Sequence, residues 1–91
     1  MEQLDGNAAA GTLQAIFPFD MTRIQVTCTG CGTTNMIGAA AAYMHGMGTI
    51  LRCPVCDTVL IRLVHAKGRY FLDMRGVRLL QISEELPMLE P

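Results

Sequence analysis

The sequence predicts a small, mainly β protein in which a short N-terminal helix precedes an antiparallel sheet. Two Cys-x-x-Cys pairs, Cys28/Cys31 and Cys53/Cys56, are separated by the 21 residues 32–52, a spacing typical of four thiolates that share one metal. Short segments rich in β-formers alternate with glycine-containing turns in the second half. One apolar segment with helical spacing lies before them. Together these features predict a zinc-ribbon antiparallel sheet with a short N-terminal helix.

Length and composition favour one domain. We expect a single domain over residues 1–82 and an acidic, mobile tail over residues 83–91. A domain of this size buries a limited core and often depends on a staple such as a metal. Hydrophobic residues make up 51% of the chain and charged residues 16%. Either a well-filled core or an exposed apolar face that meets a partner would account for this composition.

The predicted helix spans residues 8–17. The preceding Asp5-Gly6-Asn7 has the composition of a turn and a helix cap. Pro18 ends the helix, because its ring disfavours the helical conformation of the residue before it. The apolar face consists of Ala9, Leu13, Ile16 and Phe17.

Six strands are predicted after this helix, in segments of strand composition that lie between turns and the two knuckles. We expect them over residues 24–27, 33–44, 49–52, 58–65, 69–74 and 77–82. Residues 45–48 and 66–68 are expected to form turns. The four alanines at 39–42 leave a helical turn open as an alternative to strand. The strands would form one small sheet with the metal at one end.

The candidate metal ligands are the four cysteines of the chain, Cys28, Cys31, Cys53 and Cys56. A metal knuckle requires a tight turn whose backbone amides point at the sulfurs, and Gly32 relieves the strain there. Zn²⁺ with four thiolate ligands has no open coordination position, so the expected site is structural.

Iron is the alternative metal, because tetrahedral thiolate sites accept either ion. The segments Cys-Thr-Gly-Cys-Gly and Cys-Pro-Val-Cys-Asp resemble the knuckles of rubredoxins, which hold one iron for electron transfer. The chain has Asp57 where rubredoxins usually have glycine, and it has no tryptophan. We therefore expect zinc in preference to iron.

Basic residues gather in the second half of the chain. Residues 52–78 hold six of the seven Lys and Arg and two Asp, which gives a local net charge of +4 (6 − 2). Such a segment could contact an acidic partner or nucleic acid, but it lacks the dense basic and aromatic pattern of a committed nucleic-acid binder. Alternatively, its arginines solvate a sheet face or pair with Asp73. The candidate partner surface consists of Arg52, Arg62, Arg69, Arg75 and Arg78.

No catalytic constellation is recognisable, so we do not expect an enzyme. The sequence shows no Ser-His-Asp order, no phosphate-binding loop and no close carboxylate pair. The N-terminus lacks a signal-peptide pattern, and no apolar run approaches the ~20 residues of a membrane span. We expect a cytoplasmic protein without a membrane span, since a reducing compartment also suits metal thiolates.

Several segments carry a resemblance to a known family. They are Leu4-Asp5-Gly6-Asn7-Ala8, Cys28-x-x-Cys31-Gly32, Leu51-Arg52-Cys53-Pro54-x-Cys56, residues 59–64 and Phe71-Leu72-Asp73-Met74-Arg75-Gly76. Together they resemble a family of small actinobacterial zinc-ribbon proteins known as a domain of unknown function. The resemblance implies an accessory role beside a redox partner, because the family's genes are often placed next to a ferredoxin-reductase-like flavoprotein and a sulfite-oxidase-like molybdenum protein.

The sequence thus supports three hypotheses. The first is a structural zinc-binding ribbon that acts through protein–protein interaction, which the resemblance extends to an accessory subunit of a flavoprotein or molybdenum oxidoreductase complex. The second is a rubredoxin-like electron carrier with iron bound to the four cysteines. The third is a nucleic-acid-binding zinc ribbon that uses the basic segment.

Overall fold

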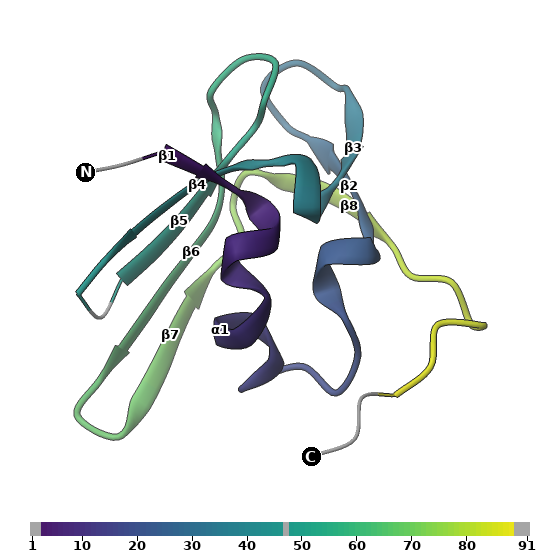
Figure 1. Ribbon diagram of the computed structural model, residues 1–91. Helices are drawn as coiled ribbons and strands as arrows, with labels where there is room; N and C mark the ends of the chain where they lie inside the picture. The colour runs from purple at the N-terminus through teal and green to yellow at the C-terminus, as the bar shows by residue number, and fades with distance from the viewer. Residues whose placement is uncertain (1–2, 47, 89–91) are drawn as a thin grey trace.

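The computed structural model describes residues 3–46 and 48–88, which fold into β-strands with a few short helical segments (Figure 1). The strands are β1 (Gln3–Asp5), β2 (Gln25–Cys28), β3 (Thr34–Met36), β4 (Ala41–His45), β5 (Gly48–Arg52), β6 (Val59–Ala66), β7 (Arg69–Asp73) and β8 (Val77–Gln81). The α-helix is α1 (Ala10–Gln14), and the 3-10 turns are η1 (Gly6–Ala9), η2 (Met21–Arg23) and η3 (Ile37–Ala39). The predicted fold class is confirmed: the protein is small, mainly β and antiparallel, with a short N-terminal helix.

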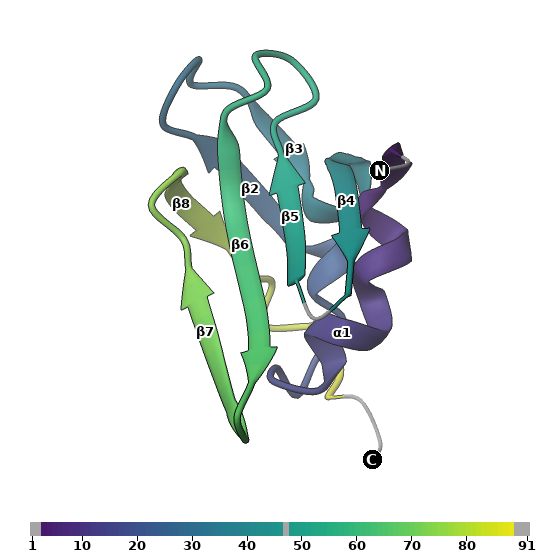
Figure 2. The same cartoon turned by 90° about the vertical axis from the view of Figure 1, so that its left-hand side faces the viewer.

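The strands form two antiparallel sheets, where the sequence predicted one. The five-stranded sheet has the order β1-β4-β5-β6-β7, and the three-stranded sheet has the order β3-β2-β8. The two sheets lie at an angle, with the helical segments filling the space between them (Figures 1 and 2). Strand β1, which the sequence analysis did not anticipate, pairs with β4 at one edge.

The predicted strand over residues 33–44 is wrong as a continuous element. It ends at Met36, makes the 3-10 turn η3, and resumes at Ala41 as β4 in the other sheet. The turn exists because Ile37 is 1% exposed in the core and its backbone N–H donates to the Ile24 carbonyl at 2.9 Å. The alternative prediction of a helical turn at the four alanines 39–42 is also only partly right, because Ala41 and Ala42 belong to strand β4.

The predicted helix over residues 8–17 is shorter than expected. Asp5 caps the segment as anticipated, accepting a hydrogen bond from the Asn7 backbone N–H at 3.1 Å, but the first turn is 3-10. The α-helix then ends at Gln14, and the backbone N–H groups of Ile16 and Phe17 both donate to the Leu13 carbonyl. This closing turn uses the last residues available before Pro18.

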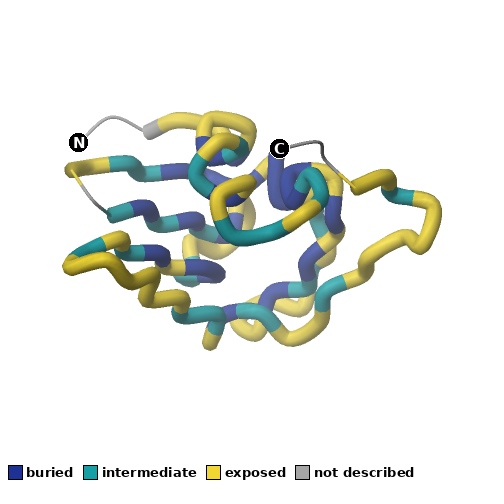
Figure 3. Tube along the Cα trace, turned by 90° about the horizontal axis from the view of Figure 1, so that it is seen from below, coloured by how far each residue is buried: buried dark blue, intermediate teal, exposed yellow. Residues whose placement is uncertain are grey.

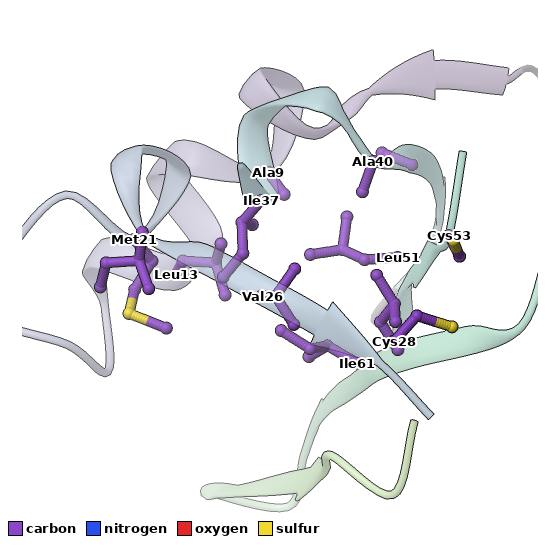
Figure 4. Close-up of a cluster of buried hydrophobic side chains, with 13 residues drawn as sticks. Ala9, Leu13, Met21, Val26, Cys28, Ile37, Ala40, Leu51, Cys53 and Ile61 are labelled. Atoms are coloured by element: carbon purple, nitrogen blue, oxygen red, sulfur yellow. The ribbon is translucent and has the colours of Figure 1, made fainter. Parts of the chain in front are cut away.

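The hydrophobic core lies between the two sheets and the N-terminal helix (Figures 3 and 4). Leu13, Val26, Leu51 and Ile61 belong to it, each at most 2% exposed. Two sulfur-bearing side chains, Cys28 and Cys53, form the end of the same cluster (Figure 4). Two of the four metal-ligand candidates are therefore continuous with the core.

The C-terminal segment after β8 is anchored where the structure describes it. The Leu86 backbone N–H donates to the Ser83 carbonyl at 3.0 Å, and Met88 forms an isolated bridge with Phe19. Leu86 is partly buried against the core. Residues 89–91 of the expected mobile tail lie outside the described residues. Within the described part of the chain, no helix has the length and apolar character needed to cross a membrane.

Candidate metal centre

The four cysteine thiols lie together at one end of the molecule. Their sulfur atoms are all within 4.8 Å of one another. The Sγ atoms of Cys28 and Cys56 are 3.6 Å apart, and those of Cys31 and Cys53 are 3.7 Å apart. A disulfide would require about 2.05 Å, whereas a tetrahedron with Zn–S bonds of about 2.3 Å places its sulfurs roughly 3.8 Å apart. The spacing therefore suits one tetrahedral metal ion.

Each knuckle closes a hairpin of a different sheet. The loop of Cys28 and Cys31 connects β2 to β3, and the loop of Cys53 and Cys56 connects β5 to β6. Both loops project in the same direction at the top of Figure 1. A metal held by all four sulfurs would consequently join the three-stranded sheet to the five-stranded sheet.

The two knuckles have the same backbone design. The N–H of the first cysteine donates to the carbonyl of a threonine five residues later, from Cys28 to Thr33 at 3.0 Å and from Cys53 to Thr58 at 2.8 Å. The residue after the second cysteine has a left-handed backbone, with φ of 76° at Gly32 and 67° at Asp57. Glycine and aspartate both tolerate this conformation better than most residues, which explains the Asp in place of the second glycine.

Two threonines that the sequence analysis missed contact the sulfurs. The hydroxyl of Thr33 lies 3.0 Å from the Cys31 sulfur, and the hydroxyl of Thr58 lies 3.0 Å from the Cys56 sulfur. A hydroxyl can donate to a thiolate, so each threonine would orient an outer ligand and reduce its charge density. The signal was present in the sequence as a repeat, Cys-x-x-Cys-x-Thr, that occurs in both knuckles.

The inner and outer sulfurs differ in environment. Cys28 and Cys53 are 2% exposed, whereas Cys31 and Cys56 are exposed. Burial acts to raise the pKa of the Cys53 thiol, but the backbone N–H groups of Cys56 and Val55 and the Thr33 hydroxyl together lower that pKa from 9.0 to about 6. The Gly30 N–H donates to the Cys28 sulfur at 3.2 Å in the corresponding way. These donors favour the thiolate, which is the form that binds metal.

The knuckles also pack against each other and against the sheets. A Cβ at Gly30 would meet the Thr58 hydroxyl and come within 3.2 Å of the Cys56 sulfur, so a side chain there would force Thr58 to move. The corresponding residue of the second knuckle, Val55, is 63% exposed. The Thr29 backbone N–H donates to the Gly76 carbonyl at 3.0 Å, and a Cβ at Gly76 would collide with the Val59 backbone.

The five candidate arginines lie at separate places. Arg52 lies beside the second knuckle, where its guanidinium donates to the Asp57 carbonyl at 3.0 Å and stands 5.8 Å from the Tyr43 ring centroid. Arg75 forms an ion pair with Asp73 at 2.7 Å. Because of the Arg75 side-chain and backbone donors, the pKa of Asp73 falls from 3.8 to about 2. The others are exposed on three strands: Arg62 on β6, Arg69 on β7 and Arg78 on β8.

The chemistry of the donor set fits a soft or borderline metal ion in a closed site. Four thiolates satisfy the tetrahedral coordination of Zn²⁺ and are also accepted by iron. Among the described residues, this is the cluster of His, Cys, Asp and Glu side chains suited to hold a metal. When bound, such an ion would supply cross-linking energy between the two sheets and leave no position for a substrate.

Comparison with known proteins places the chain in a family. A model for a family of unknown function, DUF6510, matches residues 1–85. No curated protein and no solved structure matches the chain. Because the family match covers nearly the whole length of the sequence, the protein belongs to the DUF6510 family of unknown function.

Proposed function

We propose that this protein is a structural zinc-binding module that acts through contacts with other proteins and not through catalysis. The observation that carries the proposal is the closed set of four thiols, with two contributed by a hairpin of each sheet. An ion with four thiolate ligands cannot activate water or bind substrate directly. Its binding energy would instead stabilise the relative position of the two sheets.

Zinc is favoured over iron by the surroundings of the sulfurs. Their described partners are backbone N–H groups and the hydroxyls of Thr33 and Thr58. Rubredoxins, which the knuckles resemble, pack aromatic side chains around their iron, whereas the aromatic pair Phe17 and Phe19, with ring centroids 6.4 Å apart, packs here at the side of the core formed by the N-terminal segment. An iron centre for electron transfer stays the alternative. The exposure of Cys31 and Cys56 would suit it, because a redox partner could approach the metal from that side.

The ion pairs of two arginines favour a protein partner over nucleic acid. The positive charges of Arg52 and Arg75 are balanced within the chain by Asp57 and Asp73. Less free positive charge then remains for phosphate contacts, which dominate nucleic-acid affinity. We also propose a partner of the ferredoxin-reductase or molybdenum-oxidoreductase class, on the basis of the family resemblance alone. A cytoplasmic location is proposed on the basis of the free thiols alone.

Elemental analysis and spectroscopy of the natively purified protein test the metal. We expect one zinc per chain and no visible absorption, because Zn²⁺ thiolate sites are colourless. Cys31→Ser and Cys56→Ser should each lower the zinc content. Stoichiometric iron with a coloured thiolate spectrum would instead establish the electron carrier.

Metal removal tests the structural role. Treatment with a strong chelator should abolish the cooperative thermal unfolding transition and change the circular dichroism spectrum, and added Zn²⁺ should restore both. A spectrum and unfolding transition unchanged after complete removal of the metal would contradict a structural site. Co-purification that recovers only nucleic acid, with no protein, would contradict the proposed mode of action.

A further inference from the structure

Strand β7 is an edge of the five-stranded sheet with an unusually apolar surface. It pairs with β6 on one side, and in the described part of the chain no strand pairs with its other side (Figure 2). Tyr70, Phe71 and Leu72 are 44%, 54% and 39% exposed. Edge strands are usually protected by charge, proline or a bulge, because their free backbone groups pair readily with another strand. The central part of β7 has none of these.

The turn before β7 determines which backbone groups reach the free edge. Lys67 and Gly68 have positive φ values of 54° and 71°, which defines a two-residue type I′ hairpin between Ala66 and Arg69. In such a turn the Arg69 N–H bonds back toward the first strand. The direction of the backbone N–H and C=O groups alternates along a strand. The backbone groups of Phe71 therefore also face β6, while those of Tyr70 and Leu72 face outward.

The side chains of β7 alternate in the same register. Phe71 lies opposite Val64, and Asp73 lies opposite Arg62, on the face that points away from the core. Tyr70 and Leu72 lie on the inner face, where the Tyr70 ring stacks on His65 with centroids 4.2 Å apart. These contacts fix the conformation of β7, so pairing at its outer edge requires little further ordering of the strand.

The sequence of β7 is self-complementary about Phe71. Read as Arg69-Tyr70-Phe71-Leu72-Asp73, it has a positive charge at one end and a negative charge at the other. We propose that two copies of this chain associate through antiparallel pairing of β7 with β7, which extends the five-stranded sheet across both subunits. This self-association goes beyond the proposed zinc-binding role and does not depend on the metal's identity.

In this arrangement every position of β7 meets a suitable counterpart. Phe71 stacks beside Phe71 of the partner subunit, and Tyr70 exchanges backbone hydrogen bonds with Leu72 of the partner subunit. Arg69 lies opposite the partner's Asp73, with a second such pair related by the two-fold axis, and each Asp73 takes this contact in addition to the ion pair with Arg75 of its own chain. A shift of this register by one residue would separate the charge pairs and move Phe71 to the opposite face. The charge pattern therefore selects a second copy in preference to an unrelated strand.

Sedimentation equilibrium of the metal-loaded protein tests the proposal. We expect concentration-dependent dimers in the range of about 10 µM to 1 mM, where an interface of moderate affinity would be populated. Leu72→Pro should give a monomer, because proline removes an outward N–H that β6 does not use and is tolerated in edge strands. A protein that stays monomeric throughout this range, or a Leu72→Pro variant that still forms dimers, would overturn the proposal.

Charge exchange tests the register. Arg69→Asp and Asp73→Arg each place like charges opposite one another in a homodimer and should weaken association about tenfold. A mixture of the two variants restores both opposite-charge pairs and should form heterodimers. Arg78→Asp, on the exposed side of β8, is the matched control and should leave association unchanged. Failure of the mixed variants to associate, while each retains metal and native circular dichroism, would refute the antiparallel register.

Discussion

The tight contact between the two knuckles can be tested at Gly30. A methyl group there would overlap the Thr58 hydroxyl and approach the Cys56 sulfur to 3.2 Å and the Thr58 Cβ to 3.3 Å. Overpacking in a well-packed site costs about 1–3 kcal/mol. If this strain exists only when the four sulfurs are brought together, Gly30→Ala should weaken zinc binding by roughly 5- to 150-fold, because about 1.4 kcal/mol corresponds to a factor of ten.

Competition with a chromophoric chelator measures this effect directly. Val55→Ala is the matched control, since Val55 is the equivalent residue of the second knuckle, is 63% exposed, and should bind zinc like the wild type. Adding Thr58→Ala to Gly30→Ala removes the overlapping hydroxyl and should recover part of the loss, as expected for residues in contact. Wild-type affinity in Gly30→Ala, or an equal loss in Val55→Ala, would refute the packing argument.

Three further predictions concern the supports of the site. Thr33→Val and Thr58→Val should each weaken zinc binding about tenfold in the same competition assay, the usual scale for groups that orient a metal ligand. Gly76→Ala should lower the free energy of unfolding in urea by about 1–3 kcal/mol because of its collision with Val59, whereas Gly11→Ala, which has open space within α1, should raise it by about 0.5–1 kcal/mol. The pKa of Asp73 is lowered in the folded state, so its contribution is complete above the unfolded value of 3.8 and is lost as the pH falls toward about 2. The stability difference between wild type and Asp73→Asn should therefore shrink over that interval, and a constant difference would show that the ion pair with Arg75 is not its source.

The parts of the fold that could be predicted from sequence are those determined by local pattern. The β6–β7 hairpin follows from two apolar strands around Lys67 and Gly68, and each end of these strands lies within one residue of the prediction. The four cysteines could be grouped because each pair lies within a single turn and the site requires four ligands. Asp5 was recognisable as a cap because its side chain acts on a backbone N–H two residues away.

The parts that could not be predicted depend on contacts between distant segments. The turn η3 interrupts a segment of strand composition because Ile37 is buried and bonded to Ile24, and because Gly38 lies close to Asn7 and Thr22, which no local pattern indicates. That interruption carries the chain from one sheet to the other, so the existence of two sheets was missed with it. The requirement for glycine at Gly30 and Gly76 has the same origin, since each meets a residue more than 15 positions away in the sequence.

The position of the metal centre explains why a closed thiolate site would be useful to this fold. The core cluster ends at Cys28 and Cys53, and the outer cysteines beyond them are exposed, so apolar burial alone supplies little at this end of the molecule. The hydrogen bond from Thr29 to Gly76 joins the first knuckle to the turn by which the chain leaves the five-stranded sheet after β7. A metal ion would add a further link, with two bonds to each knuckle. Loss of the ion should consequently open this end first, and amide hydrogen exchange should rise at Thr29 and Gly30 before it rises at Leu51 or Ile61 in the core.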